Sequence, residues 1–180
     1  MSVGIDGSNA NVLPDLSMSV AAFSSAPSAV PSPALATPER TIASRVLGDQ
    51  VVSADSLLRF PEGLHGFESS LEFALVPAAR EGFYWLQSTA EAGLAFLLMD
   101  PFRVAPDYEL DLGAGDEQFL QLDDSTDALV LTVVTLPSGK GAPATTNLRG
   151  PIVINTRRCV ARQVVSSVDG YSLHAEFSLG

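Results

Sequence analysis

Few side chains in this sequence could carry nucleophilic chemistry. Cys159 is the sole cysteine, His65 and His174 are the only histidines, and no serine stands in a GxSxG motif. Nucleophilic hydrolysis needs a serine or cysteine within hydrogen-bond reach of a base that a third group orients. We expect Cys159 to be a small core residue in a strand, His174 to lie on the polar face of a strand, and His65 to lie in an exposed loop. No nucleophile and base are therefore predicted to meet.

Templates for binding phosphate, metal or sugar fit no better. The segment PSGKG at residues 137–141 lacks the spacing of a phosphate-binding loop and the Ser or Thr that follows its lysine, so it is predicted to connect two strands. One cysteine and two histidines leave little material for a metal site, and carboxylates without a sugar-binding cleft do not make a glycosidase pair. We predict no catalytic residue, no cofactor and no metal.

The carboxylates carry more information, because they are unevenly distributed. The 180-residue chain has 21 acids against 10 bases, a formal charge of −11. Residues 100–127 hold nine carboxylates against Arg103 alone, whereas residues 140–180 are net basic. Gathered on one surface, the acidic segment would steer a basic protein and repel nucleic acid and anionic membranes. The alternative is a solvated acidic face that only aids solubility.

Short strands separated by turn residues are expected from about residue 45 onward. Apolar and polar residues alternate over 71–76, aromatic residues fill 83–87, and residues 94–99 and 128–136 are nearly continuous apolar runs. Such runs suit strands that are covered on both faces. A short helix is expected at residues 114–122, with Asp116 and Glu117 in its first turn. The predicted fold class is all-β: a small antiparallel β-barrel-like or sandwich domain with one short helix.

Two local patterns predict particular strand partners. The alternation over residues 171–179 follows Asp169-Gly170, a dipeptide typical of type I′ turns, so this strand is expected to form a hairpin with residues 159–168. Pro151 is expected to confine residues 147–155 to an edge or a bend, and an edge strand there could take up a strand from a partner.

The first 40 residues differ in composition from the rest. Residues 1–38 contain eight Ser, seven Ala and five Pro, with Asp6 and Asp15 as the charged residues. This composition predicts a disordered tail over residues 1–40 that partner binding does not require, followed by one domain over residues 41–180. Residues 1–38 show neither the basic n-region nor the continuous apolar h-region of a secretory signal, so none is predicted. The apolar runs of the sequence are shorter than the roughly 20 residues of a membrane helix.

Four ordered stretches resemble the flagellar assembly factor FliW family. They are RFPEGLHGFE at 59–68, WLQS at 85–88, DPF at 100–102 with PDY at 106–108, and TNLRGPIVIN at 146–155 continuing to QVV at 163–165. The resemblance spans about residues 45–178. It implies a small cytoplasmic β-barrel-like protein without enzymatic activity that binds newly made flagellin and the RNA-binding regulator CsrA. Binding to CsrA relieves repression of flagellin translation, and accumulating flagellin displaces CsrA.

The acidic segment and the family motifs together give the predicted partner-binding residues. They are Asp107, Tyr108, Glu117, Asp123, Asp124, Asp127, Asn147 and Asn155. For the two asparagines, the alternative is a side chain that closes a turn. The predicted partners are CsrA and flagellin, with no direct nucleic acid and no membrane. A rival hypothesis is an enzyme that acts on a cationic substrate in an acidic barrel mouth, which requires convergent polar side chains in one pocket.

Overall fold

The computed structural model describes residues 38–137, 139 and 141–178. The fold is mostly β, as predicted, with one short α-helix, α1, at Ala114–Leu120 inside the expected range. Its strands are β1 (Glu39–Ile42), β2 (Gln50–Ser53), β3 (Leu57–Arg59), β4 (Glu72–Pro77), β5 (Phe83–Ser88), β6 (Ala95–Met99), β7 (Ala128–Thr135), β8 (Ala144–Thr146), β9 (Ile152–Asn155), β10 (Val160–Gln163) and β11 (Ala175–Phe177). Three 3₁₀ turns are η1 (Ala54–Ser56), η2 (Pro101–Arg103) and η3 (Ser125–Asp127).

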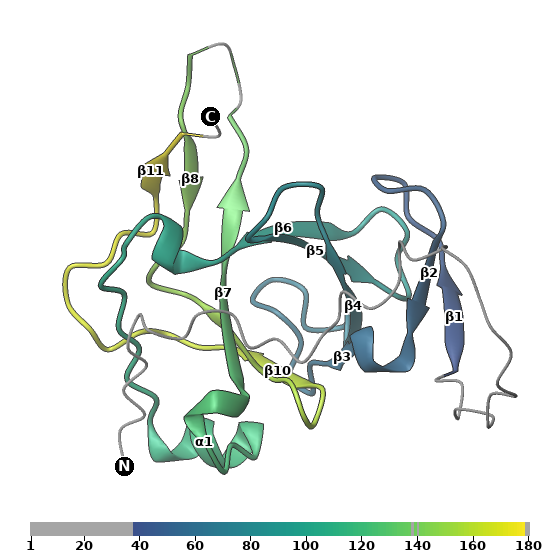
Figure 1. The fold of residues 1–180 in the computed structure, drawn as a ribbon, viewed down its shortest axis with the longest axis horizontal. Coiled ribbons are helices and arrows are strands. Elements are labelled where there is room, and N and C mark those ends of the chain that lie inside the picture. The colour runs from purple at the N-terminus through teal and green to yellow at the C-terminus, as the bar shows by residue number, and fades with distance from the viewer. Residues whose placement is uncertain (1–37, 138, 140, 179–180) are drawn as a thin grey trace, which may run out of the picture.

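Seven strands close into a barrel in the order β7, β6, β5, β4, β3, β10, β9 and back to β7. Neighbours are antiparallel except β3 and β10, which are parallel. The eight-residue β7 closes the barrel because its first half pairs with β9 and later residues pair with β6. The end of β7 pairs with β8, which in turn carries β11, so these two strands project beyond the barrel (Figure 1).

The barrel is filled by apolar side chains, and outer layers cover part of its wall. Phe60, Phe73 and Leu131 are among the fully buried residues that meet inside. Val130, the neighbour of Leu131, faces the opposite way into a second cluster that includes Leu120 of α1. Both faces of β7 are therefore buried, which explains the continuous apolar run at residues 128–136.

The hairpin of β1 and β2 covers the outer side of β4, where Ile42 and Val52 pack against Ala74. Because β1 begins at Glu39, the boundary predicted at residue 40 falls inside a strand. The predicted tail otherwise lies at residues 1–37, outside the described residues. No helix of the described ranges is long and apolar enough to cross a membrane.

The predicted hairpin between residues 159–168 and 171–179 is wrong. Gly170 does turn the chain, with φ +95°, but the following strand β11 pairs with β8 instead of β10. The reason is topological, because barrel closure already pairs β10 with β9 and β3 and leaves it no free edge. Cys159 likewise lies outside a strand, in left-handed conformation (φ +51°) just before β10.

Pro151 stands at a bend and not on an edge strand. It immediately precedes β9, which pairs with β7 on one side and β10 on the other. Its carbonyl accepts a hydrogen bond from the Val164 N–H (2.9 Å). The idea that this segment takes up a partner strand is therefore wrong, because neither side of β9 is free.

Candidate functional site

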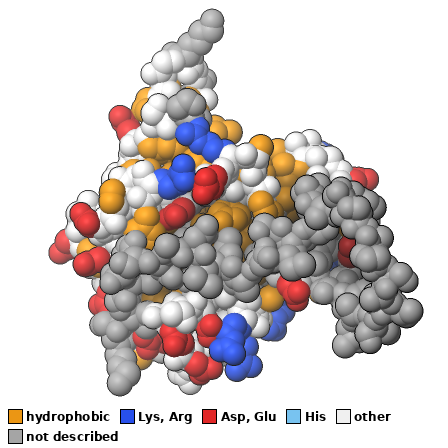
Figure 2. All heavy atoms as spheres, in the orientation of Figure 1, with side chains coloured by type: hydrophobic (Ala, Val, Ile, Leu, Met, Phe, Trp, Pro, Cys, Tyr) orange, Lys and Arg blue, Asp and Glu red, His pale blue; other side chains and the backbone are white. Residues whose placement is uncertain are grey.

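Acidic and basic side chains from distant segments meet along α1 and the turns that follow it. We call this group the acid–arginine surface, and it consists of Asp116, Asp123, Asp124, Asp127, Arg157, Arg158 and Arg162. The carboxylates come from α1 and the turn that follows it, and the arginines come from β10 and the turn between β9 and β10. In Figure 2, red and blue side chains lie next to one another at the lower end of the molecule, where Figure 1 places α1.

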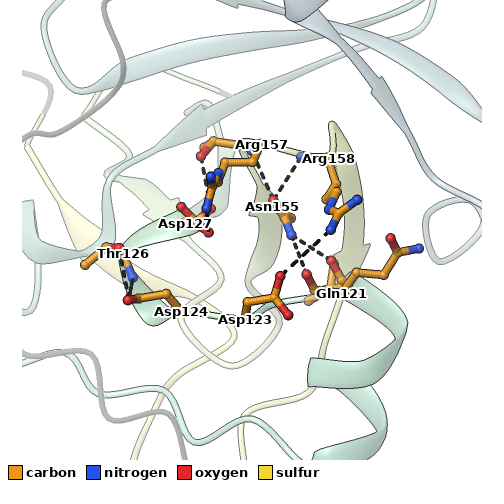
Figure 3. Close-up of polar contacts among 10 residues, drawn as sticks. Gln121, Asp123, Asp124, Thr126, Asp127, Asn155, Arg157 and Arg158 are labelled. Atoms are coloured by element: carbon orange, nitrogen blue, oxygen red, sulfur yellow. Dashed lines mark hydrogen bonds and ion pairs between the residues drawn. The ribbon is translucent and has the colours of Figure 1, made fainter.

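Asn155 holds the two halves of this surface together. Its side chain is 1% exposed at the end of β9. The Nδ2 amide donates to the carbonyl oxygens of Leu120 and Gln121 at the end of α1, both at 2.9 Å. Its Oδ1 accepts from the N–H groups of Arg157 and Arg158, both at 3.0 Å (Figure 3). One buried side chain thus satisfies helix-end carbonyls, which have no partner within the helix, and also shapes the arginine turn.

Asp124 and Thr156 fix the segment that carries Asp127. The Asp124 carboxylate accepts from the backbone N–H (2.8 Å) and the hydroxyl (2.9 Å) of Thr126 (Figure 3). These two bonds, with a smaller contribution from the Arg157 charge, lower the pKa of Asp124, so this carboxylate is ionised at neutral pH. Thr156 donates to the Asp127 carbonyl from both its N–H (2.9 Å) and its hydroxyl (3.0 Å).

Each arginine of the surface faces a carboxylate. Arg157 lies 3.2 Å from Asp127, and Arg158 lies 3.8 Å from Asp123. Arg162 is less exposed, contacts Asp116 and Glu62 at 3.0 Å each, and lies 4.4 Å from the centre of the Phe119 ring. Exposed ion pairs contribute little to stability, so their main effect is to neutralise charge locally.

The charge polarity along the sequence is therefore partly cancelled in space. The acidic segment does not form a uniformly negative surface, because three of its carboxylates pair with arginines from the basic segment. The other six acids of the segment make no ion pair among the described residues, and these are Asp100, Asp107, Glu109, Asp111, Glu117 and Asp124. They provide the net negative field that remains.

Three of the predicted partner-binding residues, Asp107, Tyr108 and Asn147, lie outside the acid–arginine surface, around a turn at residues 147–150. Tyr108 is fully buried, stacks on Tyr171 with ring centres 4.6 Å apart, and donates its hydroxyl to the Leu148 carbonyl at 2.7 Å. Burial and the neighbouring Tyr171 raise the pKa of Tyr108, which keeps the hydroxyl a donor. Asn147 accepts from the N–H groups of Arg149 (3.1 Å) and Gly150 (2.9 Å). Asp107 is exposed beside Tyr108.

Both asparagines therefore close turns, which was the alternative considered from the sequence. Asn155 and Tyr108 are buried, and each holds backbone groups of a nearby turn in place. Asp123 and Asp124 are open to solvent. The sequence reasoning missed Arg157, Arg158 and Arg162 as members of the surface. A signal was present, because an asparagine that ends an apolar strand and precedes Thr-Arg-Arg is typical of a capped turn.

The residues considered for nucleophilic chemistry make no hydrogen bond with one another in the described part of the chain, although Cys159 directly follows Arg158 and its Sγ lies 3.8 Å from the Thr156 carbonyl. His65 Nδ1 is 3.0 Å from the Gln163 side-chain oxygen, and His174 is exposed. Cys159 is half-buried, and burial raises the pKa of its thiol, with Asp55 adding to the shift. In the described part of the chain, no three His, Cys, Asp or Glu residues gather as metal ligands. A hollow beside β8 and β11 has Glu176 as its one carboxylate.

Together, fold and surface define a small, closed, mostly antiparallel β-barrel protein with a structured charged surface at the end of its helix. The FliW protein family model matches residues 41–177. The flagellar assembly factor FliW of Moorella thermoacetica is 41% identical over 119 residues, which are 66% of this chain and 75% of that protein. The Treponema pallidum protein of the same name is 38% identical over 128 residues, 71% of this chain and 85% of that protein.

Solved structures agree with the sequence comparison. A crystal structure of the flagellar assembly factor FliW aligns with a TM-score of 0.69 and 29% sequence identity, covering 76% of this chain and 96% of that chain. The family match covers all seven barrel strands, together with β2, β8 and β11 outside the barrel. The chain belongs to the FliW family.

Proposed function

We propose that this protein is a non-enzymatic, cytoplasmic flagellar assembly factor that binds flagellin and the RNA-binding translational regulator CsrA. While it holds CsrA, flagellin translation is free of repression. When flagellin accumulates and occupies the protein, CsrA is released and translation stops. The observation that carries the proposal is the FliW family match over residues 41–177.

The electrostatics of the acid–arginine surface support CsrA as a partner. A protein that holds RNA needs a basic surface, and such a surface is attracted by unpaired carboxylates. Asp124 is ionised, exposed and unpaired, and Asp123 has only a 3.8 Å contact with Arg158 and an 82% exposed side chain. A basic partner can therefore approach these two carboxylates without first breaking a strong internal ion pair.

The fixed geometry of the surface also favours recognition. Asn155 and Thr156 fasten the arginine turn to α1 and η3 through buried or half-buried hydrogen bonds. A surface that is ordered before binding loses little conformational entropy in the complex. The charges that a partner meets are thus already in place.

The rival hypothesis of an enzyme needs acids that converge in the barrel mouth. The interior is instead packed with apolar side chains such as Phe60 and Leu86, and the ion-paired acids lie outside it. The hollow beside β8 and β11 is lined by Pro137, Ala144 and Phe177 together with Glu176, the single carboxylate noted above. These features favour a binding protein.

Association with purified CsrA, measured against salt concentration, tests the proposal. We choose the triple change of Asp123, Asp124 and Asp127 to Asn, because an amide at position 124 can still accept from Thr126. Association at low salt should slow about five- to tenfold, and its salt dependence should flatten, because long-range attraction is lost.

The matched control changes three exposed acids outside the acidic segment: Asp49 to Asn, and Glu81 and Glu176 to Gln. Its net charge is identical to that of the triple variant, so both variants lose the same long-range attraction at low salt. At about 0.15 M salt, where the screening length is about 8 Å, the control should change association by less than about twofold, whereas the triple variant should still slow it. Equal effects of the two triple variants would place the CsrA site elsewhere. If the wild-type protein forms no complex with either CsrA or flagellin, the proposed function is wrong.

A further inference from the structure

The connection between β3 and β4 is held together by its own backbone hydrogen bonds. We call residues 60–71 the Phe67 loop. Its backbone makes hydrogen bonds from Gly63 to Phe60 (2.9 Å), from Phe67 to Leu64 (2.7 Å) and from Ser70 to Phe67 (3.0 Å). The ends are joined by the Phe60 N–H and the Leu71 carbonyl at 2.8 Å. The loop therefore has a single defined shape.

Two glycines are required for that shape. Gly63 and Gly66 have φ of +70° and +82°, which favours glycine. A Cβ at Gly63 would lie 2.5 Å from the backbone Cα of Glu68, so a residue with a side chain does not fit there unless the backbone moves. The Glu68 carboxylate closes the second turn by accepting from the Gly66 N–H at 2.9 Å.

Side chains of β10 hold the loop from outside. The Gln163 side-chain oxygen accepts from the His65 N–H (3.3 Å), and its Nε2 donates to the Gly150 carbonyl (3.2 Å). Glu62 pairs with Arg162 at 3.0 Å. The loop is thereby fixed to the barrel and to the turn at residues 147–150.

This rigid loop presents apolar side chains to water. Phe67 is 40% exposed and Leu71 is 51% exposed. The Phe67 ring packs edge-on against Phe96 (centres 5.1 Å apart), and Phe96 contacts Phe73 inside the barrel (6.3 Å). A rigid, exposed aromatic residue backed by core aromatics is the kind of residue that dominates binding energy in protein interfaces.

The charges around Phe67 indicate which partner fits. Glu62 and Glu72 are neutralised by Arg162 and Arg40. Glu68 and Glu91, by contrast, make no ion pair among the described residues. Glu91 is kept near the loop by the Ser70 hydroxyl, which donates to its carboxylate at 3.3 Å. An exposed apolar anchor on a loop that carries one unpaired carboxylate and contacts another is complementary to an apolar segment with a Lys or Arg beside it.

We propose that the Phe67 loop binds an apolar segment of monomeric flagellin that carries a Lys or Arg next to its apolar anchor. This inference rests on the proposed function. A filament subunit buries apolar surface against its neighbours, and that surface is exposed in the monomer. CsrA must instead present a basic RNA-binding surface, which the acid–arginine surface complements. The two partners thus contact different residues of the barrel. Arg162, which pairs with Asp116 and with Glu62 of the Phe67 loop, links the two places, so that flagellin binding at one can release CsrA from the other.

Titration calorimetry with purified monomeric flagellin and, in parallel, with CsrA tests the inference. Phe67→Ser should weaken flagellin binding at least tenfold and change CsrA binding less than about twofold. The conservative Phe67→Leu should stay within about threefold of wild type, because an apolar anchor remains. Glu91→Gln keeps an acceptor for Ser70 and should weaken flagellin binding about two- to threefold at low salt.

Leu136→Ser is the matched control, because Leu136 is 50% exposed and follows β7 in the hairpin that projects beyond the barrel (Figure 1). It should leave both affinities unchanged. Circular dichroism and thermal unfolding of each variant show whether the fold is kept. Wild-type affinity of a folded Phe67→Ser variant for flagellin overturns the inference and leaves the proposed function intact, whereas absence of wild-type binding to both partners overturns the proposed function itself.

Discussion

Replacing Asn155 by Ala tests whether one buried amide holds the acid–arginine surface together. The change removes four hydrogen bonds, two donated to carbonyls at the end of α1 and two accepted from the arginine turn. A net contribution of about 0.5–1.5 kcal/mol for each bond, with buried groups left unpaired, gives a loss of about 3–5 kcal/mol in the free energy of unfolding. At about 3 °C per kcal/mol for a domain of this size, Tm should fall by about 9–15 °C.

Asn147→Ala is the comparison that isolates burial from turn closure. Asn147 also caps a turn, but it is half-exposed and makes two such bonds instead of four. Water can replace some of the lost hydrogen bonds, so the free energy of unfolding should fall by about 1 kcal/mol. Urea unfolding of the two variants beside the wild type measures both values. A loss below about 1 kcal/mol for Asn155→Ala would refute the role assigned to its side chain.

Asn155→Asp separates the two halves of the amide. Its carboxyl can still accept from the N–H groups of Arg157 and Arg158, but it points a second oxygen at the carbonyls of Leu120 and Gln121. Burial and these carbonyls raise the pKa of the new carboxyl above its unfolded value of about 4. The stability difference from wild type should therefore be smallest at low pH and grow as the pH rises above about 4. A pH-independent difference would contradict the assigned geometry.

Two further predictions concern the turn before β4 and the lone thiol. Gly63→Ala should lower the free energy of unfolding by about 3 kcal/mol or more, because its Cβ meets the Glu68 backbone. Gly48→Ala, with φ +72° and no atom within 4 Å of its Cβ, should lose only about 1 kcal/mol. Equal losses in urea unfolding would contradict this. Cys159 should react with iodoacetamide more slowly in the folded protein than in urea, because burial raises the pKa of its thiol. For the same reason, its reaction rate should keep rising at pH values where the rate of a free thiol has levelled off. Equal rates in the folded and unfolded protein would argue against this.

Local patterns located the longer strands and the helix, but they gave no range for the short strands β1, β2, β3 and β8. The strands at 83–88, 95–99 and 128–135 and the helix at 114–120 fall where alternation, aromatic content and apolar runs placed them. Residue type also anticipated that asparagines close turns. The predicted hairpin of residues 159–168 with 171–179 was wrong. A turn signal such as Asp169-Gly170 indicates where the chain changes direction, but it does not determine which strand the next strand pairs with.

By itself, the sequence determined the all-β character of the protein, the place of its helix and its family, because these depend on residue type and order within short stretches. Tertiary structure alone decided which edges were free and which charges met. Arg157 is 30 residues from Asp127, and Asn155 is 35 residues from the Leu120 carbonyl that it satisfies. Barrel closure brings these groups together, and Asp123 and Asp124 beside them are the exposed carboxylates that we assign to a basic partner.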